Sequence, residues 1–497
     1  MHIERIQDVD TLRKVALLLD RHVRTLNTYV RELKEENARL KGQDAQAVQR
    51  EIEALKELLA QRERVIFAEK TEQRPRTGDE SVPSEPAPQR GHGPRVQPSL
   101  PILDLIHELD EADLICPKCG GPLVEMEGQT EDSEEVTVIE RRFAILKHQR
   151  KKYRCACNGC VDTAPGPLKL QPGSRYSTAF AVEVAVNKYL DHLPLERQAR
   201  IMRREGLTVD SQTLWDQLDV LAKVLQPTYD ALSRHVLEAE VVGADETWWR
   251  LMDTKGSKRW WVWSVTRDDA VIYKTLPSRS QEAARQVLDG YRGIVLADGY
   301  SAYEALSRAG PSFALAHCWA HVRRKFIEAE PHFPEPCGQV LDLIGQLYAL
   351  EGEVPSDPAD RAAALALRHS LRQQRSRPLV RDIRDWALAQ RPLPESGLGK
   401  AVSYMLGLWK GLTLFLDDPR IPLDNNATER GLRGVVLGRK NHYGSRSERG
   451  TEVAALFYSL LESAKLAGVE PKLYLLTATR ATLANRGTVT LPHELRV

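Results

Sequence analysis

VVGADETWWR (residues 241–250) and GIVLADGYSAYEAL (residues 293–306) are the stretches that decide the fold of this chain. Each contains a short run of β-branched and other apolar residues, which is typical of a buried strand. Each run then reaches an aspartate, Asp245 in the first and Asp298 in the second, where the strand would turn toward solvent. We therefore expect both carboxylates at strand ends.

The elements around these stretches follow a definite order. Strands are predicted at 240–251, 260–267, 270–276 and 294–297, with a hairpin about Asp268-Asp269 and a helix at 281–288. Asp245 and Asp298 belong to the first and fourth strands. This order matches the ribonuclease-H-like arrangement, in which two aspartates lie side by side on neighbouring strands. A further strand at 312–316 leads into a basic helix, HCWAHVRRKF (317–326).

A third acid, Glu429, lies in LDNNATERGLRG (423–434), a segment that caps and starts a helix. It comes 131 positions after Asp298 (429 minus 298). Most of 337–416 is helical, Ala/Leu/Arg-rich sequence, so we expect an all-helical insertion at 336–420. The core would then occupy 237–335 and resume at 421–497, where the new helix projects Glu429 inward.

Three carboxylates delivered to one point suit a phosphodiester site with two metal ions. Carboxylate oxygens bind hard Mg²⁺ or Mn²⁺ and leave places for water and a substrate phosphate. Two ions roughly 3.5–4 Å apart would activate the attacking oxygen and neutralise the leaving one. Asp245, Asp298 and Glu429 are therefore the predicted catalytic and metal-binding residues. Glu246 should face the opposite side of its strand.

The N-terminal segment, 1–68, is predicted to form a parallel coiled-coil dimer. Leucines recur every seven residues, with mostly β-branched residues at the other core position and one Asn. The leucines are Leu12, Leu19, Leu26, Leu33 and Leu40. The alternative is a single helix packed on its own core. Residues 69–101 follow, rich in Pro, Gly, Ser and charges, and predict a disordered linker.

Five of the seven cysteines lie between 116 and 160 and predict a zinc ribbon at 102–170. Between CPKCGG (116–121) and CACNGC (155–160), the sequence alternates like antiparallel strands, and 35 residues separate Cys119 from Cys155. Four thiolates would close the zinc shell, so the Zn²⁺ would be structural. The expected ligands are Cys116, Cys119, Cys157 and Cys160, with Cys155 as a substitute for Cys157. Unrelated reduced cysteines are the alternative.

Residues 171–236 predict a helical, helix-turn-helix-like DNA-binding domain. One helix ends near Gly206, and a second begins where Asp210 or Ser211 can cap it. Ser211, Gln212 and Thr213 would then enter a major groove. A helical hairpin that binds nothing is the alternative.

Basic residues close to the three acids are candidates for phosphate contacts. They are Arg323, Arg324 and Lys325 in the basic helix, Arg430 and Arg433 beside Glu429, and Arg439 and Lys440 in the basic turn that follows. Ordinary solvated surface is the alternative. His317, Cys318 and His321 could suggest a second metal site, but a packed helix start with His321 hydrogen-bonded or touching DNA is the preferred interpretation.

Composition places the chain among soluble, multidomain α+β proteins. It has 497 residues, is 42% hydrophobic and 28% charged, and carries a formal net charge of +1. No apolar run approaches the roughly 20 residues of a membrane span, and the start lacks a signal-peptide pattern. We expect a cytoplasmic bacterial protein that joins the nucleoid when bound to DNA.

Taken together, these motifs resemble the insertion-sequence-66 transposases of the DDE type. The resemblance rests on the leucine zipper, the cysteine segment, DETWWR, LADGYSAYE, HCWAHVRRKF, DNNATERGLRG, LGRKNHYGS and the C-terminal AALFYSLLESAKLAGVEPKLYL. It implies that Asp245, Asp298 and Glu429 form the DDE triad and that LPLERQ belongs to a DNA-binding stretch. It also implies double-stranded DNA as substrate and additional small accessory proteins. A nuclease that cuts without joining and a catalytically inactive DNA-binding regulator are the alternatives.

Overall fold

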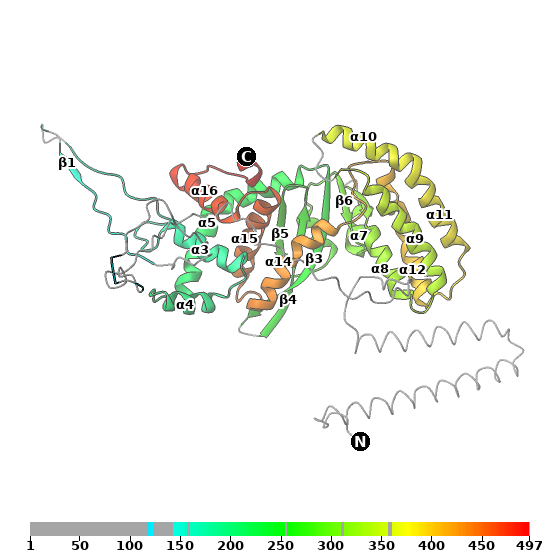
Figure 1. Ribbon diagram of the computed structural model, residues 1–497, viewed down its shortest axis with the longest axis horizontal. Helices are drawn as coiled ribbons and strands as arrows, with labels where there is room; N and C mark the ends of the chain where they lie inside the picture. The colour runs from blue at the N-terminus through cyan, green and yellow to red at the C-terminus, as the bar shows by residue number, and fades with distance from the viewer. Residues whose placement is uncertain are drawn as a thin grey trace, which may run out of the picture. The chain divides into compact units, whose positions relative to one another are not determined.

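The computed structural model describes residues 118, 120–122, 143–154, 156, 160–253, 256–309, 313–355 and 360–496 (Figure 1). The predicted coiled coil, the linker and the cysteines 116, 119, 155 and 157 lie outside the described residues. Two compact units divide the chain, 73–142 and the remainder. The account that follows concerns the second unit.

A five-stranded sheet forms the centre of this unit. Its strands are β3 (Val241–Asp253), β4 (Gly256–Thr266), β5 (Val271–Leu276), β6 (Ile294–Ala297) and β7 (Ala314–His317), in the order β5-β4-β3-β6-β7. β3, β4 and β5 pair antiparallel, whereas β6 and β7 run parallel to β3. The strand order agrees with the sequence prediction. β4 begins earlier than expected, because β3 and β4 stay paired out to Asp253 and Gly256.

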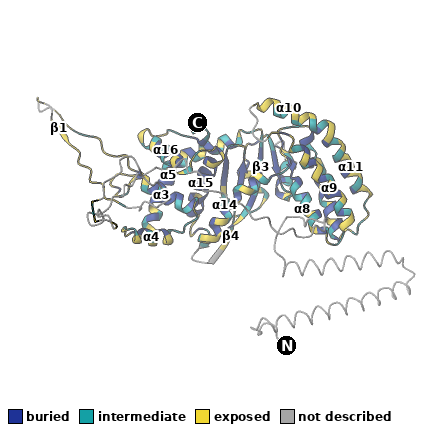
Figure 2. Cartoon of the chain, viewed as in Figure 1, coloured by how far each residue is buried: buried dark blue, intermediate teal, exposed yellow. Residues whose placement is uncertain are grey.

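Helices that precede the sheet in the sequence and helices that follow it share one hydrophobic core with it. They are α3 (Thr178–Tyr189), α4 (Leu195–Arg204), α5 (Ser211–Leu237), α15 (Glu448–Leu466) and α16 (Pro471–Ala484). Leu218 of α5, Val265 of β4 and Phe457 of α15 are all fully buried in that core. The buried residues of the sheet and of α15 are seen together in Figure 2. Residues 178–237 are therefore packed against the sheet and do not form a core of their own.

A second hydrophobic core belongs to the helices between the sheet and α14 (Asn426–His442). The helices α6 (Gln281–Val287), α7 (Ser301–Arg308) and α8 (Trp319–Ala329) come first along this part of the chain. Between α8 and α14, the described elements are all helical. The elements are α9 (Pro334–Glu351), α10 (Arg361–Leu371), a π-helical turn η3 (Arg372–Ser376), α11 (Arg377–Ala389), α12 (Gly397–Gly407), α13 (Trp409–Leu412) and η4 (Leu414–Leu416). Trp319, Ile344 and Met405 are buried among them.

A buried arginine holds the end of these helices. Arg372 lies in the π-helical turn, pairs with Glu351 at 2.6 Å and donates a hydrogen bond to the carbonyl of Phe415 at 2.8 Å. A buried charge needs both a partner and hydrogen bonds. These contacts therefore hold the end of the helical segment in place where the chain leads into α14.

Three small elements complete the described chain. β1 (Lys152–Arg154) and β2 (Val161–Thr163) pair antiparallel on either side of the cysteines at 155–160, and η5 (Pro492–Leu495) lies close to the C-terminus. None of the described helices has the length and apolarity needed to cross a bilayer.

Candidate active site

Asp245 and Asp298 lie on neighbouring parallel strands. Val241 pairs with Ile294 and Gly243 with Leu296, so the same register places Asp245 beside Asp298, directly after the end of β6. Residues two apart on a strand share a face. The two carboxylates therefore leave the sheet on the same side, as the sequence predicted.

Glu429 reaches this side because α14 begins against β3. Asn425, which precedes the helix, is buried, donates from Nδ2 to the carbonyl of Ala244 at 2.9 Å and donates from its backbone to Cys318 Sγ at 3.2 Å. A Cβ at Gly243 would lie 2.1 Å from Oγ1 of Thr428. Only glycine allows this approach, which sets the first turn of α14, and with it Glu429, beside Asp245.

The neighbouring carboxylates perturb Asp245. Burial, the largest cause, and the negative charges of Glu246, Asp298 and Glu429 together raise the pKa of Asp245 to about 8, against the hydrogen bond from the Glu246 amide. That hydrogen bond, from the Glu246 backbone to Asp245 Oδ1, is 2.8 Å long. Carboxylates this close together are stable only if one of them is protonated or a cation binds between them.

The donor set fits a hard divalent cation. Asp245, Asp298 and Glu429 offer only oxygen ligands, which Mg²⁺ and Mn²⁺ prefer. Oε1 of Glu429 is buried and accepts no hydrogen bond from any described residue. An orphaned buried carboxylate oxygen is costly unless a ligand occupies it. By their donor atoms these three residues could hold a metal. Among the described residues, the ligand atoms within 4.8 Å of one another are those of Cys318, His321 and Glu429 and those of His235, Asp269 and His493.

Replacing Asp245 with asparagine is expected to stabilise the metal-free protein at alkaline pH. The folded pKa of about 8 lies above the ordinary value of 3.8, so the folded state binds the proton more tightly than the unfolded state. Stability therefore falls as pH rises between those two values, and Asp245→Asn removes this part of the slope. Urea unfolding at pH 5, 6.5 and 8 without divalent ions measures it. Glu304→Gln is the control, and parallel curves for the wild type and Asp245→Asn would contradict the assignment.

Two side chains of α8 lie against Glu429. Nε2 of His321 is 3.5 Å from its Oε1, and Nη2 of Arg324 is 3.7 Å from its Oε2. One ligand atom each from Cys318, His321 and Glu429 lies within 4.8 Å of the others. The sequence interpretation placed His321 in helix packing or on DNA and missed its position beside the triad. The spacing of Cys318, His321 and Arg324, three residues apart on one helix face, was the available signal.

Glu246 faces away from the triad, as alternation along the strand predicts. Its side chain is 0% exposed, lies 2.5 Å from Nη2 of Arg279 and accepts a hydrogen bond from the Tyr303 hydroxyl at 2.8 Å. Arg279 also stacks on Tyr300, 3.8 Å from the ring centre, and its carbonyl accepts a hydrogen bond from the Tyr300 hydroxyl.

This ion pair, in which Glu246 is buried and the Arg279 side chain is 36% exposed, is tied to the second aspartate as well. The backbone of Tyr300 donates to Oδ1 of Asp298 at 3.0 Å. Arg279 therefore connects the residue that follows Asp245 with the residue that orients Asp298. The sequence analysis singled out neither Arg279 nor Tyr300.

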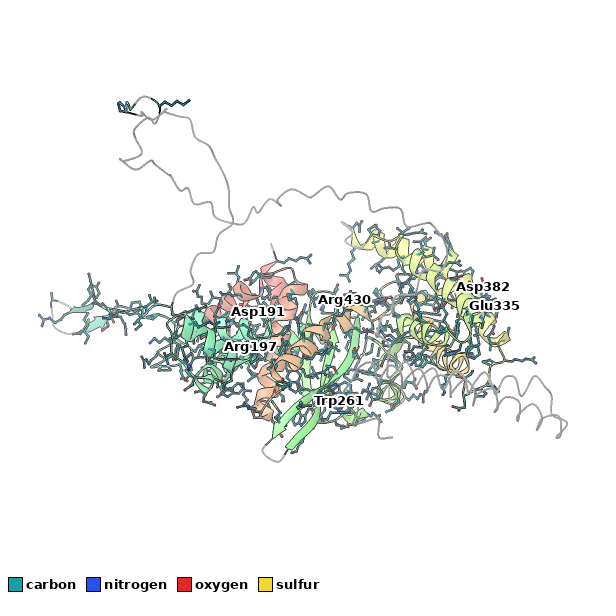
Figure 3. All side chains as sticks on the ribbon, turned by 60° about the horizontal axis from the view of Figure 1, so that its bottom comes forward. Asp191, Arg197, Trp261, Glu335, Asp382 and Arg430 are labelled. Atoms are coloured by element: carbon teal, nitrogen blue, oxygen red, sulfur yellow. The ribbon has the colours of Figure 1, made fainter. Side chains whose placement is uncertain are left out.

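The basic candidates for DNA binding take different positions. Arg430, Arg433 and Lys440 are exposed on α14, where Figure 3 labels Arg430. Lys325 is exposed and pairs with Glu328 at 3.4 Å, while Arg323 is partly buried. Arg439 is only 9% exposed, and it donates a hydrogen bond to Oγ1 of Thr247 at 3.0 Å.

The start of α5 is held by local contacts. Asp210 is the N-cap and accepts a hydrogen bond from the Thr213 amide at 2.6 Å. Ser211 donates to Glu196 at 2.5 Å, and Gln212 donates to Asp216 at 2.9 Å. Gly206, which separates α4 from α5, has a φ of +88°, so the predicted break is where the sequence placed it.

Comparisons with known proteins place the chain in a family. Residues 173–453, more than half of the chain and including all three acids, match the family model described as "Transposase IS66 family". Residues 113–158 match the "zinc-finger binding domain of transposase IS66". The solved structure described as "Crystal structure of a pre-cleavage Mos1 transpososome" is 13% identical, covering 50% of this chain and 81% of its own, with a TM-score of 0.12. That likeness is too weak to support an argument.

Curated relatives cover most of the chain. The "Uncharacterized protein y4jD" of Sinorhizobium fredii is 33% identical over 76% of this chain and 76% of its own length. The "Uncharacterized protein y4hP" of the same organism is 29% identical over 73% of this chain and 70% of its own length. The extent of the family match and the identity to these relatives lead to one conclusion: this chain belongs to the IS66 family of transposases.

Proposed function

We propose that this transposase cleaves the ends of an insertion sequence and joins the freed 3′-hydroxyl to target DNA. The catalytic unit would be a ribonuclease-H-like core interrupted by the helical segment between α8 and α14. The observation that carries the proposal is the in-register placement of Asp245 and Asp298 on β3 and β6, with Glu429 brought to the same side by α14.

The three carboxylates would hold two divalent ions, Mg²⁺ or Mn²⁺, which supply Lewis-acid stabilisation of charge at the reacting phosphate. The side chains around them keep this acidic site in place. His321 and Arg324 restrain the carboxylate of Glu429, and the backbone of Tyr300 restrains that of Asp298. Water would attack in the cleavage step and the DNA 3′-hydroxyl in the joining step, so no covalent protein intermediate is required.

Double-stranded DNA, as element ends and as target, is the proposed macromolecular substrate. Arg430, Arg433 and Lys440 follow Glu429 along the exposed side of α14 and would place phosphates over the triad. Arg323 and Arg324 start from the same part of the site, because the guanidinium of Arg324 lies against the carboxylate of Glu429. Assembly through the N-terminal coiled coil as a homodimer or larger complex, with accessory transposition proteins, completes the proposal.

Structural zinc is proposed for the cysteine segment, whose family match supports a zinc-binding domain. Cys116 and Cys119 supply one ligand pair. The matched residues, 113–158, include Cys155 and Cys157 and stop before Cys160. Cys157 and Cys160 would supply the second pair, with Cys155 as a substitute for Cys157.

Replacing Cys119 with serine should remove one equivalent of bound zinc per chain, because three thiolates hold Zn²⁺ far more weakly than four. Elemental analysis of the purified full chain measures it. Cys337→Ala, which removes a buried thiol from α9, should keep its zinc. Cys157→Ser is expected to lose zinc and Cys155→Ser to retain it, and the opposite pattern would place Cys155 in the site instead of Cys157.

A strand-transfer assay tests the proposed reaction. The full chain is incubated with Mg²⁺, DNA flanking its gene that carries pre-cut ends, and a target plasmid. Joined products support a transposase. Hydrolysis without joining would instead identify a nuclease, and a protein whose activities are unchanged by Asp298→Asn would be a DNA-binding regulator.

A further inference from the structure

The hairpin of β3 and β4 extends beyond the rest of the sheet. β6 pairs with β3 only as far as Gly243, and β5 pairs with β4 only from Trp261 onward. β3 and β4 nevertheless remain paired to Asp253 and Gly256. The far part of the hairpin therefore projects past its neighbouring strands (Figure 1).

One face of this projection carries two tryptophans and two arginines. Trp248 pairs across the strands with Trp261, and Arg250 pairs with Arg259. Because residues two apart on a strand share a face, these four side chains form one surface, called here the tryptophan–arginine face. Trp261 is labelled on the hairpin in Figure 3.

The charge on this face is not balanced within the described chain. Arg250 and Arg259 are exposed and lie directly opposite each other. Like charges in such a pair destabilise a hairpin. Neither guanidinium has a carboxylate within 4.0 Å among the described residues. A polyanion laid over the hairpin would relieve this repulsion.

The tryptophans are held ready for stacking. The guanidinium of Arg439 lies 3.9 Å from the ring centre of Trp248, and that of Arg279 lies 5.0 Å from Trp261. Arg439 is itself fixed by its hydrogen bonds to Thr247 and to the Trp248 carbonyl. Trp248 still keeps 37% of its surface exposed. An indole fixed in this way is an aromatic platform with accessible ring surface.

The face lies on the opposite side of β3 from the triad. Trp248 is two residues from Glu246 and three from Asp245, so it shares the side of Glu246 and not that of Asp245.

We propose that the tryptophan–arginine face binds an unpaired stretch of DNA. A base would stack on Trp248, and the adjoining phosphates would lie on Arg250 and Arg259. The strand would be unpaired because a base in a duplex is already stacked on both sides, and aromatic platforms of this kind bind exposed bases. This inference rests on the proposed function only in taking DNA as the substrate.

Binding without catalysis tests it. The full chain is titrated, without added divalent ions, into a fluorescent twelve-nucleotide oligothymidine and into a blunt duplex of mixed sequence. Arg250→Glu/Arg259→Glu is compared with Arg381→Glu/Arg391→Glu, which reverses two exposed charges in the helical segment and so keeps net charge equal. Trp248→Ala is compared with Trp248→Phe, and thermal unfolding confirms that each variant folds.

Arg250→Glu/Arg259→Glu should weaken oligothymidine binding at least tenfold more than Arg381→Glu/Arg391→Glu does. It should also lower the salt dependence of that binding. Trp248→Ala should weaken oligothymidine binding about tenfold, Trp248→Phe less, and neither should change duplex binding. Equal effects of the two charge reversals would overturn the proposal, as would equal losses on both probes for Trp248→Ala. These results do not depend on cleavage, so failure of the transposase assay remains a separate outcome.

Discussion

Asp298→Asn is expected to lower the rate of DNA cleavage by at least about a thousandfold while leaving the protein folded, because metal-assisted stabilisation at a phosphate is worth several kcal/mol. Asparagine keeps the shape of the side chain and can still accept the hydrogen bond from Tyr300 at Asp298 Oδ1. It removes the negative charge that a divalent ion requires. Single-turnover cleavage of DNA flanking the gene, at saturating Mg²⁺, measures the rate.

The control for this substitution is Glu304→Gln. Glu304 lies on α7, shortly after Asp298, and its carboxylate pairs with Arg308 at 2.9 Å. Glu304→Gln removes the same charge without touching the triad, so the cleavage rate of this variant should stay within about twofold of wild type. A comparable loss in both variants would mean that net charge, and not metal binding by Asp298, controls the rate. Unchanged cleavage by Asp298→Asn would remove the residue from the site.

The sequence was sufficient to predict the two aspartates because their signals are local. A run of β-branched residues that ends in an acid is visible within ten positions, and strand alternation then fixes the side on which each carboxylate lies. The same alternation placed Glu246 on the opposite side, where it contacts Arg279. Glu429 was found differently, from a helix start and from the family resemblance.

Other features of the site were not predictable because they depend on contacts across the chain. Gly243 gives no sign in sequence that Thr428 will pack against it. Arg439 appeared to be one more basic surface residue, but the strand edge that it contacts is formed far away in the chain. Ser211 and Gln212 fit a recognition helix by position, and only the structure shows their bonds to Glu196 and Asp216.

Replacing Arg279 with methionine should be the most destabilising single change near the site that does not touch the triad. It leaves the Glu246 carboxylate buried without its partner, and breaking a buried pair in this way costs about 3 kcal/mol. Arg285→Met is the matched control, since its partner Glu282 is 60% exposed and its own side chain 54%. An exposed pair of that kind contributes less than about 1 kcal/mol. Urea unfolding measures both changes.

A second substitution separates charge from packing at this position. If the loss in Arg279→Met comes from the uncompensated carboxylate, then adding Glu246→Gln should recover part of the stability, because a neutral amide is easier to bury. If lost stacking on Tyr300 and Trp261 were the cause, the double variant would be no more stable than Arg279→Met. Cleavage activity should follow the same order, since the ion pair connects the strand of Asp245 with the backbone that orients Asp298. A fully stable, fully active Arg279→Met would show that the two aspartates are positioned without this pair.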